Sequence, residues 1–433
     1  MAFDPRKLPG APTRGDVFQF NFEGSQITAY EGESIAEALL SAGVSRLSRS
    51  PKYHRPRGAF CFAGQCGTCL VRVNGRPNVR ACTEPAFQHT RCERQNAFPD
   101  GDADVLRASD WLFPGGMDHH HLMTGTKVGN DLFVKLVRQM GGTGVLPDAP
   151  ETRFGEMRHA FYDVCVVGSG PAGLAAAIAI KQRHGSTRVV VVDQQKSLGG
   201  SLLAEPEGGR IVDDLRGQLA ANNIDLWLSS TALGHYPEDE STAPQGVADV
   251  VPGVMAILRS NHIAVMSARR FIFATGSYEQ NLPFPSNDVP GVVAARALGR
   301  LVFARGILPT PKVTLLCDPT LPTPYADRLQ SGLLQLGVQV NRLTFNDGQD
   351  VTVKGKTTLA VAALPAPAFE LPRQHGVPCG MRPEAGGFAA QANADGSTNI
   401  QGIFVAGDVT GYVGPKNAET HGKAVGLAVG DSL

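Results

Sequence analysis

The strongest constraint on the fold is a glycine-rich segment, YDVCVVGSGPAGLAAAIAI, which is followed after a short loop by the apolar run RVVVVD. GSGPAG has the spacing G-x-G-x-x-G and lies between a run typical of a buried strand and an alanine-rich helix. The first glycine permits a tight turn, the second lets the backbone approach a pyrophosphate, and the third lets helix and strand pack closely. The segment therefore predicts a strand–helix–strand unit with a dinucleotide at the helix N-terminus.

The residue types around this turn fit a dinucleotide site. Gly168, Gly170 and Gly173 are the three glycines. Asp193 follows the next apolar run, where an acidic residue that accepts hydrogen bonds from ribose hydroxyls belongs. A turn of a parallel sheet that binds no ligand is the alternative interpretation.

Two distant segments favour FAD as the dinucleotide. One apolar strand ends in Ala274-Thr275-Gly276 and another in Gly407-Asp408. With the glycine motif, they resemble the two-dinucleotide-binding-domain flavoproteins of the glutathione-reductase-like group. The resemblance implies that Gly-Asp contacts the ribityl–phosphate region of FAD and that Ala-Thr-Gly closes over the cofactor, with NAD or another adenine nucleotide as the alternative. The expected cofactor-binding residues are Gly168, Gly170, Pro171, Ala172, Gly173, Asp193, Gln194, Gly200, Ser201, Thr275, Gly276, Gly407 and Asp408.

A second strand–helix–strand pattern departs from that flavoprotein group. The segment PKVTLLCDPTLPTPYAD has no G-x-G-x-x-G, and Pro319 and Pro322 have no backbone N–H to donate to a pyrophosphate. We expect a degenerate NAD-binding-like domain without a working nicotinamide site. No Cys-x-x-Cys pair accompanies it, so an ordinary NAD(P)H-disulfide reductase is not expected.

A cysteine-rich stretch, CFAGQCGTCLVRVNGRPNVRAC, provides the candidate metal ligands. Its cysteines are spaced Cys61-x4-Cys66-x2-Cys69-x12-Cys82. The first three match the C-x4-C-x2-C spacing of plant-type 2Fe-2S proteins, in which a fourth ligand lies further along the chain. The intervening glycines let the loop curl so that amide N–H groups can point at the sulfurs of a negatively charged cluster.

Zinc is the main alternative, although structural zinc sites usually pair two short Cys-x2-4-Cys knuckles and here only one short knuckle is present. Disulfides conflict with a reducing compartment. Cys165 lies inside an apolar run and is expected to be a small core residue. Three further cysteines lack neighbouring ligands: Cys92, Cys317 and Cys379.

The residues before the cysteines predict a compact unit. Residues 17–30 alternate as a β-hairpin, and a helix should begin after Ser34 and end at Gly43. LVRVNGRPNVRAC predicts two strands joined by an Asn-Gly turn. This arrangement resembles a β-grasp ferredoxin, and also the ferredoxin domain of the iron–sulfur protein of succinate dehydrogenase.

The order of motifs carries a wider resemblance. SPKYHRPRG, DWLFPGGMDHHH, the glycine motif with VVVVDQQKSLGGSL, and GIFVAGD follow one another along nearly the whole chain. The sequence resembles the α subunit of heterotetrameric sarcosine oxidases and the related opine oxidases, hydroxyproline dehydrogenases and hydrogen cyanide synthase. Sarcosine oxidase α subunits lack the four cysteines and continue into a folate-binding domain, whereas this sequence has the cysteines and stops at Leu433.

The resemblance implies an electron-transfer role without catalytic residues in this chain. A partner FAD-containing β subunit would oxidise an amine, imino acid or opine, a further FMN could lie at the interface with that partner, and smaller subunits could be present. Flavin takes two electrons at once and can release them singly to a 2Fe-2S cluster, which would pass them to an external acceptor. The rivals are a self-sufficient NAD(P)H-dependent reductase and an assembly protein with a structural nucleotide.

Charge and hydropathy limit the classes of partner that we expect for this protein. Lys+Arg and Asp+Glu are both 40, which argues against nucleic acid because phosphate binding requires a basic excess. The sequence shows no secretory signal and no apolar run long enough to span a membrane, so a cytoplasmic location is expected.

The expected fold class is α/β: a β-grasp ferredoxin-like domain fused to a glutathione-reductase-like two-dinucleotide-binding-domain fold. The predicted domains are the ferredoxin-like domain (1–95), a connector (96–157), the FAD-binding domain (158–283 and 385–433) and the degenerate domain (284–384).

Two polar segments remain without a fixed role. His119, His120 and His121 are adjacent and cannot all face one metal easily, so loop contacts or a cofactor edge are favoured over a metal site. A basic run could neutralise the cluster or a flavin phosphate, or could simply be solvated. Its members are Arg49, Lys52, His54, Arg55 and Arg57.

Overall fold

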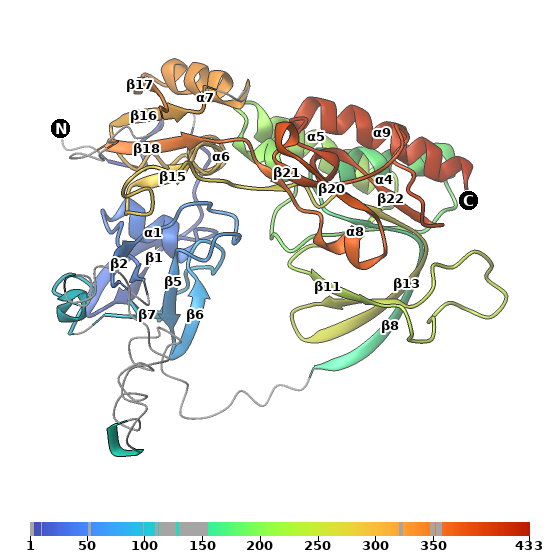
Figure 1. The fold of residues 1–433 in the computed structure, drawn as a ribbon, viewed down its shortest axis with the longest axis horizontal. Helices are drawn as coiled ribbons and strands as arrows, with labels where there is room; N and C mark the ends of the chain where they lie inside the picture. Colours follow the sequence, from blue (N-terminus) through green and yellow to red (C-terminus); the bar gives the residue numbers. More distant parts are fainter. Residues whose placement is uncertain are drawn as a thin grey trace. The chain divides into compact units, whose positions relative to one another are not determined.

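The chain forms two compact units in the computed structural model (Figure 1). The first unit comprises residues 1–151, 281–317 and 330–361, and the second comprises 152–280, 318–329 and 362–433. The structure describes residues 4–9, 11–50, 53–97, 99–108, 111, 127–129, 155–319, 324–346, 351 and 357–433. The predicted domain boundaries stay a prediction.

A five-stranded sheet in the first unit has the order β2-β1-β7-β5-β6. The predicted hairpin is present, with β1 and β2 antiparallel. Asn74 and Gly75 both take positive φ in the tight turn between β5 and β6, as the Asn-Gly signal predicts. The bounds are β1 Val17–Phe22, β2 Ser25–Tyr30, β5 Leu70–Val73, β6 Arg76–Arg80 and β7 Arg91–Glu93.

Helix α1 (Ile35–Ser41) covers this sheet with a buried face. Ser34 is the N-cap and forms a capping box with Glu37, in which the Ser34 side chain accepts from the Glu37 amide and the Glu37 carboxylate accepts from the Ser34 amide. Gly43, with φ +83°, follows the helix end, so both predicted ends of this helix are confirmed.

The first unit also contains most of a four-stranded sheet, ordered β15-β18-β16-β17. Its neighbours β15/β18 and β16/β17 are parallel, which fits the second strand–helix–strand pattern. The strands are β15 Val292–Ala294, β16 Lys312–Cys317, β17 Gln339–Thr344 and β18 Thr357–Ala362, with helix α7 Pro324–Gln335 between β16 and β17.

A seven-stranded sheet organises the second unit, in the order β10-β9-β8-β13-β12-β11 with β22 paired to β13. Strand β13 is parallel to both β8 and β22. The carboxyl ends of these three strands therefore lie at one edge of the sheet. The bounds are β8 Glu156–Val167, β9 Val189–Val192, β10 Asp225–Trp227, β11 Thr231–Tyr236, β12 Val254–Leu258, β13 His262–Phe273 and β22 Ile403–Val405.

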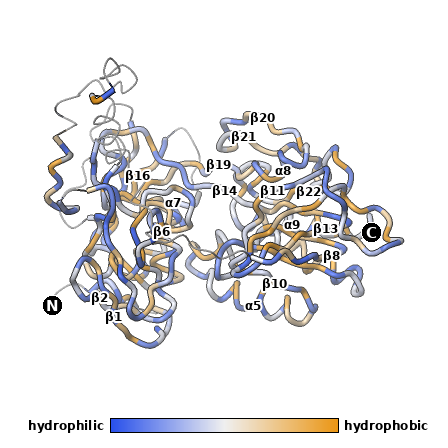
Figure 2. Tube along the Cα trace, turned by 90° about the horizontal axis from the view of Figure 1, so that it is seen from below, coloured by the Kyte–Doolittle hydropathy of each residue, from blue (hydrophilic) through white to orange (hydrophobic). Residues whose placement is uncertain are grey.

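Helices α4 (Pro171–Arg183) and α9 (Pro415–Asp431) pack side by side against this sheet (Figure 1). Glycines make the close approach possible: a Cβ at Gly422 would lie 2.1 Å from the Ala172 carbonyl oxygen, and one at Gly426 would lie 2.4 Å from that of Ala176. The core between them is apolar, and Figure 2 shows hydrophobic stretches along α9, β22 and β13.

The remaining described elements complete the fold. They are β3 Ser48–Arg49, β4 Pro56–Arg57, η1 Val105–Arg107, η2 Gly200–Ala204, α5 Gly208–Ala221, β14 Ser277–Tyr278, α6 Ala295–Gly299, η3 Arg300–Ala304, β19 Ala366–Pro367, α8 Glu370–Gln374, β20 Cys379–Arg382, η4 Pro383–Ala385, β21 Gly387–Ala390 and η5 Gly407–Thr410. Among the described residues, no helix has both the length and the hydropathy that crossing a membrane requires. His119 to His121, Lys52 and Pro322 lie outside the described residues.

Two histidines of the second unit stack on each other. The rings of His235, on β11, and His375, after α8, have centroids 3.9 Å apart and an interplanar angle of 16°. His375 Nδ1 lies 3.0 Å from the Leu371 carbonyl oxygen, and its ring also packs against Phe273. Burial lowers the pKa of His375 to about 4, so the folded protein keeps this ring neutral well below the pKa of an exposed histidine.

This stack predicts a loss of stability in mild acid. As the pH falls below about 6.5, His375 becomes protonated in the unfolded chain. In the folded chain it stays neutral until the pH is about 4. The free energy of unfolding should therefore fall by about 2 kcal/mol between pH 7.5 and pH 5 through this residue alone. Urea unfolding of His375→Phe should show a shallower decrease than the wild type, whereas His159→Phe, at an exposed site on β8, should keep the wild-type slope. An unchanged slope in His375→Phe would contradict the assignment.

Candidate functional site

The four predicted cysteine ligands lie together in the first unit. Cys61 and Cys69 are each 1 % exposed, Cys82 is buried and Cys66 is half-buried. Their thiols contact one another in the sequence Cys66–Cys61–Cys82–Cys69, and none is in a disulfide. Among the described residues, no three Cys, His, Asp or Glu side chains are placed to hold a single metal ion.

The contacts between these thiols change their acidity. Hydrogen bonds from Cys66 and Cys82 lower the pKa of the Cys61 thiol far below its usual range, and a hydrogen bond from Cys82 lowers the pKa of Cys69. The thiolate is the form that binds metals. The same hydrogen bonds raise the pKa of the Cys66 and Cys82 thiols, so two of the four sulfurs have thiolate character and the other two donate to them. Four adjacent, largely buried cysteine sulfurs are a donor set that fits an iron–sulfur cluster.

The backbone of the cysteine loop also fits this interpretation. Gly64 and Gly67 have φ of +73° and +67°, in the left-handed region that favours glycine. The Gln65 amide donates to Cys61 Sγ at 3.3 Å, and Cys66 Sγ lies 3.1 Å from Thr68 Oγ1. Donors at sulfur stabilise the negative charge of a bound cluster.

Residues far along the chain brace this loop. The amide of Ala294, at the end of β15, donates to the Phe60 carbonyl oxygen at 3.0 Å. Arg300 Nη1 donates to the Cys61 carbonyl oxygen at 3.2 Å. The cysteine loop is therefore held by the segment 281–317 of the same unit as well as by its own neighbours.

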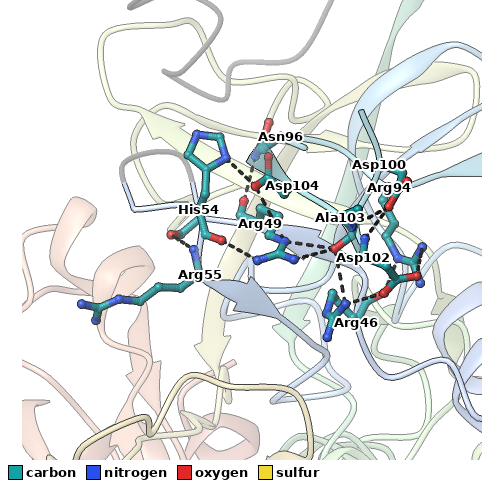
Figure 3. A network of polar contacts seen from close by, with 12 residues as sticks. Arg46, Arg49, His54, Arg55, Arg94, Asn96, Asp100, Asp102, Ala103 and Asp104 are labelled. Atoms are coloured by element: carbon teal, nitrogen blue, oxygen red, sulfur yellow. Dashed lines mark hydrogen bonds and ion pairs between the residues drawn. The ribbon is translucent and has the colours of Figure 1, made fainter. Parts of the chain in front are cut away.

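The basic run beside the cysteines takes part in an internal polar network (Figure 3). Arg49 is buried, and its guanidinium donates to the carbonyl oxygens of Gly101 at 2.8 Å and His54 at 2.9 Å. His54 is fully buried, with Nδ1 3.0 Å from Asp104 Oδ2. These contacts tie the run to residues 101–104, and a role in neutralising a cofactor stays a prediction.

The glycine loop lies in the second unit between β8 and α4. A Cβ at Gly168, where φ is +114°, would lie 2.1 Å from the Ala274 carbonyl oxygen, and one at Gly173 would lie 2.0 Å from that of Gly168. At Gly170, by contrast, a Cβ would meet nothing within 4 Å. The first and third glycines thus permit close packing, while the second borders open space at the start of α4.

This open space fits a pyrophosphate. Gly170 is the N-cap of α4, Pro171 is its first residue, and no side chain caps the free amides of the first turn. Such amides and the positive end of the helix dipole attract an anion. A second loop borders the same place, because a Cβ at Gly200 would lie 2.9 Å from Gly170 Cα. Ser201 follows in η2 and Ala172 in α4.

The carboxylate of Asp193, the acidic residue after β9, accepts hydrogen bonds from two other residues of the chain. Asp193 Oδ2 accepts from the Ser169 amide at 2.6 Å and from the Ser169 hydroxyl at 2.7 Å. Asp193 Oδ1 accepts from the Gln195 amide at 2.8 Å. The side chain of Gln194 is exposed. A contact between Asp193 and a ribose stays a prediction, and no motif indicates the bonds to Ser169.

The two distant motifs reach the same sheet edge as the glycine loop. The Ala274 amide donates to the Val167 carbonyl oxygen at 2.8 Å, and the Ala406 amide donates to that of Phe273 at 3.0 Å. A Cβ at Gly407 would lie 2.7 Å from Ala172 Cβ. The segments that end in Thr275-Gly276 and Gly407-Asp408 therefore lie beside the glycine loop, as parallel pairing of their strands requires.

Asp408 is buried, and both of its carboxylate oxygens have partners. Oδ2 accepts from the Ser277 hydroxyl at 3.0 Å, and Oδ1 accepts from the amides of Val413 and Gly414 at 3.0 and 3.2 Å. Ser277 was not predicted from the sequence. Nor was His421 on α9, whose Nδ1 accepts from the Gly407 amide at 3.2 Å and whose pKa is lowered by burial. Neither residue belongs to a recognisable motif.

Comparison with known proteins supports both parts of the site. Residues 15–97 match the family described as a 2Fe-2S iron-sulfur cluster binding domain, and residues 166–223 match the NAD(P)-binding Rossmann-like domain. The chain is similar in fold to the crystal structure of L-proline dehydrogenase from P. horikoshii, with a TM-score of 0.72 and 20% identity over 99% of this chain and 76% of that one. The predicted fold class is confirmed.

The chain is also similar in sequence to subunits of three kinds of enzyme, over different shares of its length. The α subunit of sarcosine oxidase from Rhizobium meliloti is 30% identical over 70% of this chain and 32% of the relative. An opine oxidase subunit from Agrobacterium tumefaciens is 24% identical over 62% of this chain and 65% of the relative. The HcnA subunit of hydrogen cyanide synthase from Pseudomonas aeruginosa is 39% identical over 19% of this chain and 79% of the relative. The chain spans about a third of the length of the sarcosine oxidase relatives it matches.

Proposed function

We propose a function on the premise that this chain belongs to the family of sarcosine oxidase α subunits and their relatives in opine oxidase and hydrogen cyanide synthase, with a 2Fe-2S domain in residues 15–97. The chain is the electron-transfer subunit of a multi-subunit oxidoreductase. A partner subunit oxidises a secondary amine, imino acid or opine, and this chain passes the electrons through flavin and the 2Fe-2S cluster to an external acceptor.

One observation carries this proposal: a loop of four converging cysteine thiols and a complete dinucleotide loop occur in the same chain. Oxidation of a CH–NH bond to an imine releases two electrons and two protons. Flavin, when bound, accepts two electrons together and releases them one at a time, which is what a one-electron cluster requires. Sarcosine and the opines are both secondary amines, which suggests the class of donor.

The residues of this chain hold cofactors in this scheme. Cys61, Cys66, Cys69 and Cys82 bind the cluster. The glycine loop and the first turn of α4 hold the pyrophosphate of FAD, and the segments that end at Thr275-Gly276 and Gly407-Asp408 border the rest of the dinucleotide. The chain contributes no catalytic acid or base.

The partners follow from the same scheme. We propose a β subunit that carries its own FAD, with FMN at the interface, further small subunits, and an external acceptor of single electrons. A cytoplasmic location suits the proposal, because a reducing compartment keeps the four thiols out of disulfides.

The test is anaerobic reduction of the complex purified with its natural partner subunits. Extraction should yield FAD and iron, and sarcosine, proline or an opine should produce the electron paramagnetic resonance signal of a reduced 2Fe-2S cluster. NAD(P)H should produce none. Reduction by NAD(P)H of the chain alone would instead favour a self-sufficient reductase. A cluster that stays oxidised while the partner turns over substrate would make this chain an assembly protein.

A further inference from the structure

Two side chains near the start of α7 contact a loop of the second compact unit, to which residues 318–329 also belong. Tyr325 is buried, and its hydroxyl donates to the Ala204 carbonyl oxygen at 2.8 Å. Arg328 donates from Nε and Nη2 to the two carboxylate oxygens of Glu205, at 2.8 and 2.9 Å. The planar guanidinium therefore binds this carboxylate through two parallel bonds, a geometry that fixes the positions of both side chains.

Arg328 has a second partner on a different loop. Its guanidinium also forms a hydrogen bond with the side chain of Tyr412, and its Cζ lies 5.6 Å from the centre of the Tyr325 ring. Hydrogen bonding to Glu205 is the main cause that raises the pKa of Arg328, and the contact with Tyr412 adds to it. One arginine thus joins the η2 loop (residues 199–205) to the Asp408 loop (residues 408–414).

Both of these loops border the proposed dinucleotide site. In the η2 loop, a Cβ at Gly200 would lie 2.9 Å from Gly170 Cα, so this loop lies against the N-terminus of α4. The Asp408 loop folds around the buried Asp408 carboxylate, which accepts from two amides of the same loop at 3.0 and 3.2 Å. Arg328 therefore connects the pyrophosphate side of the site with the side formed by Gly407-Asp408.

The surroundings of the carboxylate make this connection stronger than a surface ion pair. The side chain of Glu205 is 12% exposed and that of Arg328 is 40% exposed. Water screens a fully exposed pair, which then contributes little. Loss of the guanidinium here would leave a largely buried carboxylate without its bidentate partner, which is destabilising. Contacts that order two loops before a ligand binds increase the affinity for that ligand.

We propose that Arg328 is a positioning residue for the dinucleotide: by joining Glu205 and Tyr412, it holds the two loops in the conformation that retains the cofactor. This inference rests on the proposed function, which places FAD at this site. It also assigns a role to the degenerate domain. The start of α7 follows β16, where a nucleotide-binding domain has its own phosphate-binding turn. In this chain, side chains from that position help to retain the dinucleotide of the other domain.

The experiment measures the rate at which FAD leaves the purified 433-residue chain, from the rise in flavin fluorescence after a large dilution. Arg328→Met removes the donors but keeps an unbranched side chain, so FAD should leave about tenfold faster than from the wild type. Arg328→Lys keeps the charge without the two parallel bonds, so its rate should fall between the two. Arg210→Met is the matched control, because Arg210 pairs with Glu207 at an exposed site of the same unit, and its rate should equal that of the wild type.

Glu205→Gln tests whether Arg328 acts through this carboxylate. The variant should also release FAD faster, and in its background Arg328→Met should add less than it does in the wild type. The thermal midpoint of the dinucleotide-free chain should fall by less than about 4 °C in each variant. An unchanged release rate in Arg328→Met would overturn the proposal, and so would faster release with a larger fall in the midpoint, which would show general structural damage. A wild-type chain that neither contains nor binds FAD would instead overturn the proposed function, so the two failures are distinguishable.

Discussion

Replacing Cys69 by alanine should reduce the iron content of the purified chain at least tenfold from about two iron atoms per chain, and should abolish the visible absorption of the cluster. Cys69 is 1 % exposed and its thiol contacts that of Cys82, so its loss removes one sulfur from the centre of the group of four. Iron analysis and electron paramagnetic resonance of the dithionite-reduced protein measure the effect. FAD should remain bound, because the glycine loop belongs to the other compact unit.

Cys92→Ala is the matched control. Cys92 lies in the same apolar core and is fully buried, but burial raises the pKa of its thiol to about 12, so it remains a neutral core residue. Its replacement should retain the iron and cost about 1 kcal/mol of stability. Equal loss of iron in the two variants would show that the effect arises from damage to the core. Retention of iron by Cys69→Ala would remove this cysteine from the ligand set.

The glycine loop should give two opposite results at neighbouring positions. Gly170→Ala should fold as stably as the wild type, because a Cβ there meets nothing within 4 Å and φ is −78°. It should nevertheless bind FAD about a hundredfold more weakly, since the methyl group occupies the space in which the backbone approaches the pyrophosphate. Gly168→Ala should lose more than about 3 kcal/mol of stability, because its Cβ would lie 2.1 Å from the Ala274 carbonyl oxygen at φ +114°.

Thermal unfolding of the dinucleotide-free chain and titration with FAD distinguish these effects. Gly217→Ala serves as the control: it lies on an exposed part of α5, a Cβ there has open space, and alanine should raise stability by up to about 1 kcal/mol without changing the affinity for FAD. If Gly170→Ala binds FAD normally, no pyrophosphate approaches this glycine.

Much of the first unit could be predicted because its signals are local. The hairpin of β1 and β2, the Ser34 cap and the Asn74-Gly75 turn each depend on a few consecutive residues, and the structure has all of them. Strand β7 could not be predicted. It has three residues and forms because it pairs with both β1 and β5. Three residues carry no local pattern from which this pairing could be predicted.

In the candidate site, too, the residues of continuous motifs could be predicted and the long-range hydrogen-bond partners could not. Spacing alone located the cysteines and the glycine loop, because each motif is a continuous stretch. Spacing could not show that Ser169 donates hydrogen bonds to the Asp193 carboxylate. Nor could it show that Ser277 and His421 are hydrogen-bonded to the Gly407-Asp408 turn. These bonds join residues that are far apart in the sequence. Such partners are set by the parallel pairing of β8, β13 and β22, and by the packing of α9 on α4.

The bracing of the cysteine loop by Ala294 and Arg300 has a consequence for biosynthesis. The chain is made from its N-terminus, so the cysteines leave the ribosome roughly two hundred residues before their braces. At about 5–20 residues per second, this delay lasts on the order of 10–40 s. During that interval the nascent loop is complete in its ligands but not yet fixed in place. Iron and sulfur that reach the chain in this interval would meet a loop that lacks its bonds to Ala294 and Arg300.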